Sequence, residues 1–144
     1  MKIAIVKETR ANETRVAGSP EVVKKLIGLG FQVVVEQDAG RDASFTDAAF
    51  RDAGATITKD AQTAFKGAGM VFKIQAPQAD EIPAIKKGTI LVASLGALSN
   101  PKEMQALARA RLTSFAMELM PRISRAQSMD ILSSQSNLAG YKAV

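Results

Sequence analysis

Six short apolar runs, separated by polar or helix-forming segments, constrain the fold of this sequence more than any other feature. Runs of this length and composition are typical of strands buried on both faces of a sheet. The predicted strands cover residues 2–6, 31–36, 54–57, 70–74, 89–93 and 112–116. Between them, a Ser, Thr, Asp or Asn stands where a helix is expected to begin, because its side chain can cap the first turn. These helix-start residues are Ser19, Thr46, Asp60 and Asn100, and proline follows the first and the last of them.

Strands and helices therefore alternate along the whole chain. This alternation predicts an α/β fold, in which an open, doubly wound parallel sheet of flavodoxin-like or Rossmann-like type carries helices on both faces. Ligands of such sheets bind at the loops that follow the carboxyl ends of the strands. We therefore expect function at a mostly cationic rim, which suits carboxylates or pyrophosphates, although each charged residue taken alone also fits a solvated loop. The rim residues are Lys7, Arg10, Arg15, Lys73, Gln75, Ser94, Glu118, Arg122, Arg125 and Gln127.

Composition excludes several kinds of chemistry. The chain has 144 residues, 47% of them hydrophobic, which is enough for one domain with a proper core. Cysteine and histidine are absent, so disulfides, Cys or His metal sites, a cysteine nucleophile and a Ser-His-Asp triad are excluded, and we expect no metal site. The net charge is +5, but the basic residues are scattered and aromatics are 5%, so we expect a small anionic ligand and no nucleic acid.

Two further classes of segment are missing from the sequence. No apolar stretch approaches the ~18 residues that would span a bilayer. The apolar segment at the N-terminus is too short for a signal peptide, and charged residues follow it at once. No dinucleotide phosphate fingerprint is present either, because Gly28-Leu29-Gly30 precedes a strand and does not follow one. The chain therefore has no pyrophosphate cradle of its own.

Polar groups are unusually dense in the last quarter, residues 117–140. Pro121 opens a loop, and Ser128 is placed to cap a helix that starts at Met129. On such a helix Asp130, Ser133 and Asn137 share one face, so that one flank is built to contact something polar. The alternative is an ordinary capped surface helix.

Several of these segments also resemble a known family. They are similar to the N-terminal part of the α subunit, the NAD(H)-binding component, of proton-translocating NAD(P) transhydrogenase. The similarity is most specific in the Arg-Ile-Ser-Arg-Ala-Gln-Ser-Met-Asp run at residues 122–130. The other similar segments are Lys7-Glu8-Thr9, residues 12–17, Ser19-Pro20-Glu21 and residues 95–98. The resemblance covers the whole chain. The wider family includes alanine dehydrogenase, with this sheet domain followed by a Rossmann domain that binds NAD(H) in the cleft between them.

The resemblance implies a site and a role. Arg122, Gln127, Asp130 and Ser133 are expected to contact the nicotinamide end of NAD(H), with Asp130 orienting Arg122 or Gln127. Arg15 and Lys73 are expected as secondary anion contacts. Hydride transfer between two nicotinamides requires no catalytic acid or base from the protein, and we expect none.

The resemblance also implies an organisation. Residues 1–128 correspond to the sheet domain and 129–144 to the start of the inter-domain helix, while the second, Rossmann domain is absent from this chain. We expect a piece of a longer protein, inactive alone, whose complete subunit forms a homodimer. Its partners are an NADP(H)-binding component and a membrane-spanning, proton-conducting component, which place it in the cytoplasm, peripheral to the inner membrane.

Two other functions remain open at this point. An alanine dehydrogenase-like enzyme would use Arg15 and Lys73 for its substrate's carboxylate and carbonyl. However, Ser94 stands where that enzyme has its catalytic histidine, and amino-acid oxidation requires a proton acceptor. The third possibility is a non-catalytic docking module whose 117–140 face meets another protein.

Overall fold

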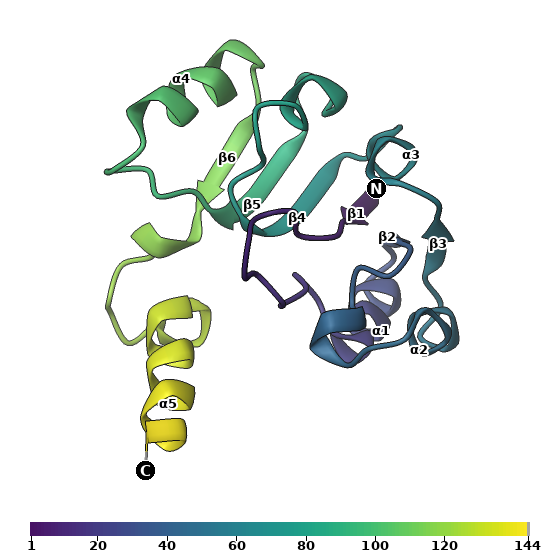
Figure 1. Ribbon diagram of the computed structural model, residues 1–144, viewed down its shortest axis with the longest axis horizontal. Helices are drawn as coiled ribbons and strands as arrows, with labels where there is room; N and C mark the ends of the chain where they lie inside the picture. The colour runs from purple at the N-terminus through teal and green to yellow at the C-terminus, as the bar shows by residue number, and fades with distance from the viewer. Residues whose placement is uncertain (144) are drawn as a thin grey trace.

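The computed structural model describes residues 1–143 and contains one parallel sheet of six strands. The strand order is β3-β2-β1-β4-β5-β6, so the chain builds outward from β1 on one side and then returns to add β4 on the other (Figure 1). This order confirms the predicted Rossmann-like, doubly wound fold, with the switch point between β1 and β4. The strands are β1 (Lys2–Ile5), β2 (Gln32–Glu36), β3 (Thr56–Thr58), β4 (Met70–Gln75), β5 (Ile90–Ser94) and β6 (Thr113–Ala116).

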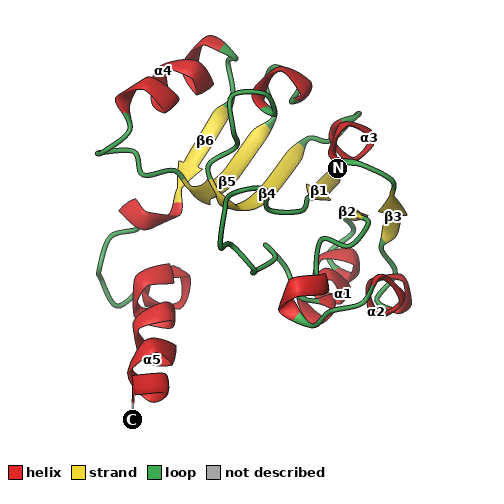
Figure 2. Ribbon diagram, in the orientation of Figure 1, coloured by secondary structure: helices red, strands yellow, loops and turns green. Residues whose placement is uncertain are grey.

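Helices cover both faces of the sheet, as Figure 2 shows. On one face α1 (Pro20–Gly28) and α2 (Asp47–Asp52) bury Val23 and Phe50 against β1 and β2. On the other face α3 (Ala61–Phe65) and α4 (Pro101–Arg109) pack on β1, β4 and β5. The last helix, α5 (Ile131–Ala143), extends away from the sheet and has no buried residue among those described (Figure 1).

Of the four caps predicted for the helices between the strands, three are confirmed. Ser19 Oγ accepts a hydrogen bond from Val22 N, Thr46 Oγ1 from Ala49 N, and Asp60 Oδ1 from Thr63 N. These bonds satisfy amide groups that have no partner inside the helix. The prediction for Asn100 was wrong in part, because its side chain makes no capping bond and α4 begins at Pro101, whose missing N–H needs no partner.

The predicted start of the last helix was also wrong. Ser128 lies inside a short 3-10 turn, Gln127–Met129, and α5 begins only at Ile131. Asp130 has an extended backbone that separates the two, and its Oδ1 accepts hydrogen bonds from Leu132 N at 3.0 Å and Ser133 N at 3.3 Å. Asp130 is therefore the cap of α5 and not a residue on its face.

Within residues 1–143, each helix is too short or too polar to cross a bilayer.

Candidate functional site

The four residues predicted to contact the cofactor line a single pocket. Arg122, Gln127, Asp130 and Ser133, together with Ile123 and Ser124, enclose about 280 Å³ between the loop after Pro121 and the first turn of α5. We call this the α5 pocket. Bringing these side chains together depends on the turn at 127–129, which folds Gln127 back beside the helix start. The structure thus groups all four residues, and their role in binding stays a prediction.

The Asp130 side chain bonds within the first turn of α5, and its expected role in orienting Arg122 or Gln127 stays a prediction. Its Oδ2 accepts a hydrogen bond of 2.5 Å from Ser133 Oγ, and this bond, with those from the backbone N–H groups of Ser133 and Leu132, holds the pKa of Asp130 below its usual value. Within residues 1–143 the Asp130 carboxylate makes no hydrogen bond to Arg122 or Gln127; its backbone N–H donates to the Gln127 carbonyl at 3.3 Å, and Arg122 acts on it through its charge. Asp130 fixes the helix start and the Ser133 hydroxyl.

A second cavity, of about 390 Å³, lies at the switch point of the sheet. Residues at or after the carboxyl ends of five strands line it: Arg15 follows β1, Phe45 follows β2, Lys73 and Gln75 lie near the end of β4, Ser94 ends β5, and Met117 follows β6. We call it the switch-point cavity. Ile131 and Gln135 of α5 complete its lining, so the first turns of this one helix contribute to both cavities.

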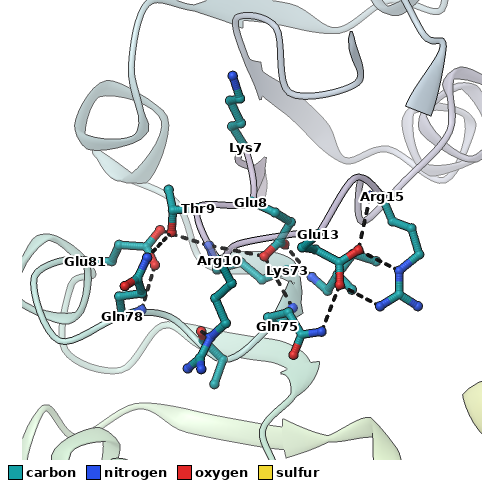
Figure 3. A network of polar contacts seen from close by, with 12 residues as sticks. Lys7, Glu8, Thr9, Arg10, Glu13, Arg15, Lys73, Gln75, Gln78 and Glu81 are labelled. Carbon is teal, nitrogen blue, oxygen red and sulfur yellow. Dashed lines mark hydrogen bonds and ion pairs between the residues drawn. The ribbon is translucent and has the colours of Figure 1, made fainter. Parts of the chain in front are cut away.

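Lys73 lies buried in an ion-paired cluster beside this cavity. The pairing of β4 with β5 shifts register between Phe72 and Gln75, and bulges of this kind redirect side chains near functional sites. The Lys73 ammonium is 2.9 Å from Glu81 Oε1 and 3.7 Å from Glu8 Oε2. Glu8 also accepts hydrogen bonds from Ile74 N and Gln75 N (Figure 3). Its carboxylate therefore serves as the acceptor for these two backbone N–H groups at the end of β4. Burial raises the pKa of Glu8, although Lys73 and these two bonds oppose that effect.

The Arg15 guanidinium is held by Glu13 through two hydrogen bonds, and the Arg15 backbone N–H donates a third to Glu13 Oε1. Arg15 Nε is 2.7 Å from Glu13 Oε1 and Arg15 Nη2 is 2.6 Å from Oε2 (Figure 3). Hydrogen bonding by Arg15 lowers the pKa of Glu13 to about 2, and Glu13 in turn raises the pKa of Arg15. Gln75 Nε2 donates to Glu13 at 2.8 Å, and Arg15 Nη1 donates to Gln135 Oε1 at 3.1 Å. A chain of polar contacts therefore links the end of β4 to α5.

The sequence-based prediction missed the acidic half of this site. Three of the six cations of the expected rim are instead ion-paired, among them Lys73 with Glu8 and Glu81, and Arg15 with Glu13. Arg10 likewise pairs with Glu103 of α4 at 3.0 Å. Only Glu13 and Arg15 are close enough in the sequence for their ion pair to be suggested by sequence alone. Whether Arg15 and Lys73 contact an anion stays a prediction. Among residues 1–143, His, Cys, Asp and Glu form no group of three that could hold a metal ion.

The sequence and the fold match a known family. The family described as Alanine dehydrogenase/PNT, N-terminal domain, matches residues 4–139, which is nearly the whole chain. The chain belongs to this family. The resemblance drawn from residues 122–130 and from the loop after β1 is thereby confirmed at the level of the family.

Relatives of this N-terminal domain include transhydrogenases and, more distantly, alanine dehydrogenases. The chain is 60% identical over 149 residues to an NAD(P) transhydrogenase subunit alpha polypeptide of Rhodospirillum rubrum, covering 100% of this chain and 39% of the relative. The crystal structure of transhydrogenase from Sinorhizobium meliloti matches with a TM-score of 0.95 and 48% identity, over 99% of this chain and 41% of that one. An L-alanine dehydrogenase structure matches with a TM-score of 0.79 and 32% identity, over 82% of this chain and 32% of its own. The domain thus spans less than half of these proteins.

Proposed function

We propose that this domain forms one wall of the NAD(H) site of an NAD(P) transhydrogenase and receives the nicotinamide end of the cofactor in the α5 pocket. The observation that carries this proposal is the grouping of Arg122, Gln127, Asp130 and Ser133 around one pocket of about 280 Å³. The family of this chain and the chain's 60% identity to a transhydrogenase subunit support the choice of reaction.

The residue types of the α5 pocket suit this ligand. The Gln127 amide offers a donor and an acceptor, which complement a carboxamide, and the Arg122 guanidinium can donate to a carbonyl or a phosphate. Both residues are exposed, so their polar groups are accessible. The pocket volume lies near the ~300 Å³ lower end of ligand pockets, which suits a ring but not a whole dinucleotide. The rest of the nucleotide would lie against a region of the transhydrogenase subunit outside the part that matches this chain.

A dihydronicotinamide bound here supplies a hydride from its C4 to C4 of an oxidised nicotinamide, so that one ring gains the positive charge that the other loses. The protein's contribution is to hold the ring, to orient it and to exclude water. Asp130 and Ser133 serve the first of these tasks indirectly, since their mutual hydrogen bond fixes the start of α5. No residue of the pocket has to accept a proton.

The same proposal extends to the assembly. The acceptor nucleotide, NADP(H), would be bound by a partner component, and a membrane-spanning component would conduct protons. The complete subunit would work as a homodimer in the cytoplasm, at the surface of the inner membrane. The relatives' description as transhydrogenase subunits supports only the existence of partner components, and the other parts of this proposal follow from the family resemblance.

A chimera tests the proposal. In it, this chain replaces the matching segment of the Rhodospirillum rubrum subunit, and NADH binding and hydride transfer to an NADP-type acceptor are measured. Gln127→Ala removes one hydrogen bond, so NADH affinity should fall roughly three- to tenfold. Arg122→Ala should weaken binding at least as much. Arg125→Ala, which removes the same charge from the same loop without lining the pocket, is the control.

Unchanged affinity and transfer rate in both pocket variants would refute the site. Pyruvate and ammonium are offered in a parallel assay. Turnover with them, and not with the nucleotide acceptor, would favour an alanine dehydrogenase-like activity instead. We expect no such turnover, because Ser94 in the switch-point cavity cannot act as a proton acceptor near neutral pH.

A further inference from the structure

Five exposed cations gather at the end of the sheet opposite to both cavities. They stand on the loops that lead into the amino ends of β4, β5 and β6. We call this surface the basic end, and its residues are Lys66, Lys86, Lys87, Arg109 and Arg111. Figure 1 shows the starts of β5 and β6 on the side of the sheet away from α5. The basic end is therefore separate from the proposed cofactor site.

Backbone hydrogen bonds hold these loops side by side. Gly88 N donates to Arg111 O at 3.0 Å, which joins the loop before β5 to the loop before β6. Ile90 N donates to Gly69 O at 3.0 Å, which joins the start of β5 to the loop before β4. Because neighbouring strands are about 4.8 Å apart, the three loops lie within roughly 10 Å of one another. The five cations thus form one surface.

No carboxylate neutralises this surface within residues 1–143. None of its five cations takes part in an ion pair there. The segments 66–69, 86–89 and 109–112 contain no acidic residue. Asp80 lines a surface pocket together with Lys66 but does not pair with it. Like charges that are crowded without partners repel one another, and an anionic partner relieves this repulsion.

Local structure accounts for only part of this arrangement. Cations near the C-terminus of a helix interact favourably with its dipole, and Lys66 and Arg109 stand at the ends of α3 and α4. Lys86 and Lys87 end no α-helix, since a short 3-10 turn precedes them. Arg111 has a left-handed backbone with a φ of 55°, for which glycine is the usual residue after a helix. The helix dipoles thus leave Lys86 and Lys87 unexplained, and the backbone at position 111 favours glycine over arginine.

Apolar side chains flank the basic end. Met1, which is 58% exposed, packs beside Gly69, where an added Cβ would lie 2.8 Å from Met1 Cγ. Gln32 N donates to Met1 O at 3.1 Å, so the turn that carries Leu29 lies next along the same end, and Leu29 is 75% exposed. Basic residues with exposed apolar side chains beside them are typical of proteins that bind to the surface of an anionic bilayer.

We propose that the basic end contacts an anionic membrane surface, with phospholipid headgroups as its ligands. Mobile headgroups can follow any spacing of cations, whereas a protein partner needs carboxylates at matched positions. The three loops contain no aromatic residue, so they lack the stacking groups that are typical of single-strand nucleic-acid sites. The choice of a membrane rests on the proposed function, which places the complete subunit beside one. Contact through this end leaves α5 on the other side of the sheet, open to nucleotides.

Vesicle sedimentation measures this contact without any nucleotide. The chain is mixed with vesicles of phosphatidylcholine alone, or of phosphatidylcholine with about one-third phosphatidylglycerol, at low salt and at roughly 0.5 M salt. We expect binding to the anionic vesicles at low salt to be roughly tenfold or more stronger than to the neutral ones, and to be lost at high salt. Inorganic phosphate at matched ionic strength should not compete, because one free anion contacts only part of the surface.

Charge reversal at the two ends of the sheet separates a local contact from an effect of net charge. Lys86→Glu with Lys87→Glu should weaken binding to anionic vesicles roughly twentyfold or more, since each basic residue near the surface contributes about fivefold. Lys59→Glu with Lys102→Glu changes the net charge equally, at exposed positions near the carboxyl ends of the strands, and should weaken it less than threefold or so. Arg111→Gly should lower the affinity roughly fivefold and leave the free energy of unfolding unchanged or higher, because glycine suits this backbone. Weaker binding in this variant would then not result from unfolding.

The possible outcomes separate this proposal from the proposed function. Absence of binding to anionic vesicles, equal binding to neutral ones, competition by inorganic phosphate, or equal losses in the two double variants would each overturn the membrane contact. Binding of a short duplex DNA at least as tightly as the vesicles, with the same dependence on Lys86 and Lys87, would assign the surface to nucleic acid instead. The α5 pocket is tested independently, since unaltered NADH affinity in Gln127→Ala would contradict the proposed function and leave the vesicle result unchanged.

Discussion

Replacing Lys73 with Met should destabilise the fold through the two carboxylates that it leaves behind. The Lys73 side chain is 1% exposed, and its partners Glu8 and Glu81 are 2% and 10% exposed. Met fills much the same volume, so the cost is electrostatic and not one of packing. Removing one partner of a buried pair costs about 3–5 kcal/mol. Because Glu8 keeps two backbone hydrogen bonds and Glu81 keeps one, we expect about 3 kcal/mol.

Urea denaturation measures this directly, as the free energy of unfolding, and thermal unfolding should show a fall in Tm of about 10 °C. Lys25→Met is the matched control, because its ion pair with Glu21 joins the same groups at 2.7 Å but on the surface, where such a pair contributes roughly 0–1 kcal/mol. The double variant Lys73→Met with Glu81→Gln removes one stranded charge and should recover about 1–2 kcal/mol of the loss.

The deficit of Lys73→Met should also depend on pH. Burial already raises the pKa of Glu8, and Lys73 opposes that rise, so the variant raises it further. A group whose pKa is raised in the folded state contributes to stability at pH values below its pKa in the unfolded state. This contribution is lost as the pH rises through its pKa in the folded state. The deficit should therefore be smaller at pH 5 than at pH 8. A loss no larger than that of Lys25→Met, or a deficit that grows toward acid, would refute the interpretation of the cluster.

Two further predictions concern Glu13 and Gly40. The pKa of Glu13 is lowered from 4.5 to about 2, so its pair with Arg15 stabilises the fold above pH 4.5 and this contribution disappears as pH falls toward 2. Arg15 is 45% exposed, so Glu13→Gln should cost only about 1–2 kcal/mol near neutrality and nothing near pH 2, by urea denaturation at each pH. A Cβ at Gly40 would lie 2.6 Å from Phe50 Cε2, so Gly40→Ala should lower stability by about 1–3 kcal/mol. Gly28→Ala, at the end of α1 with open space around it, should be neutral or stabilising by up to about 1 kcal/mol, and equal effects would contradict the packing argument.

Much of the fold could be predicted from the sequence because its signals are local. Apolar runs gave all six strands to within one or two residues, and Ser19, Thr46 and Asp60 cap their helices as expected. The start of α5 was harder to predict, since Ser128 and Asp130 can both serve as caps. The intervening 3-10 turn, which decides between them, has no distinctive residue pattern.

The acidic half of the site could not be predicted in this way. Glu8 contacts backbone groups at Ile74 and Gln75, 66 and 67 residues further along, and Glu13 meets Gln75 across 62. Which loops meet depends on the strand order, and the alternation of strands and helices does not specify that β4 returns to the side of β1. Single rim cations were therefore visible in the sequence, but their counter-charges were not.

The first turns of α5 have an evolutionary consequence, because successive side chains on a helix are offset by about 100°. Ile131 and Gln135 point to one cavity, and Asp130 and Ser133 line the other. Single substitutions can therefore tune either cavity separately. A one-residue insertion or deletion in this segment would instead rotate the lining side chains away from both cavities at once. We expect the spacing from Asp130 to Gln135 to be fixed wherever both cavities are used, so the two sites are inherited as one unit.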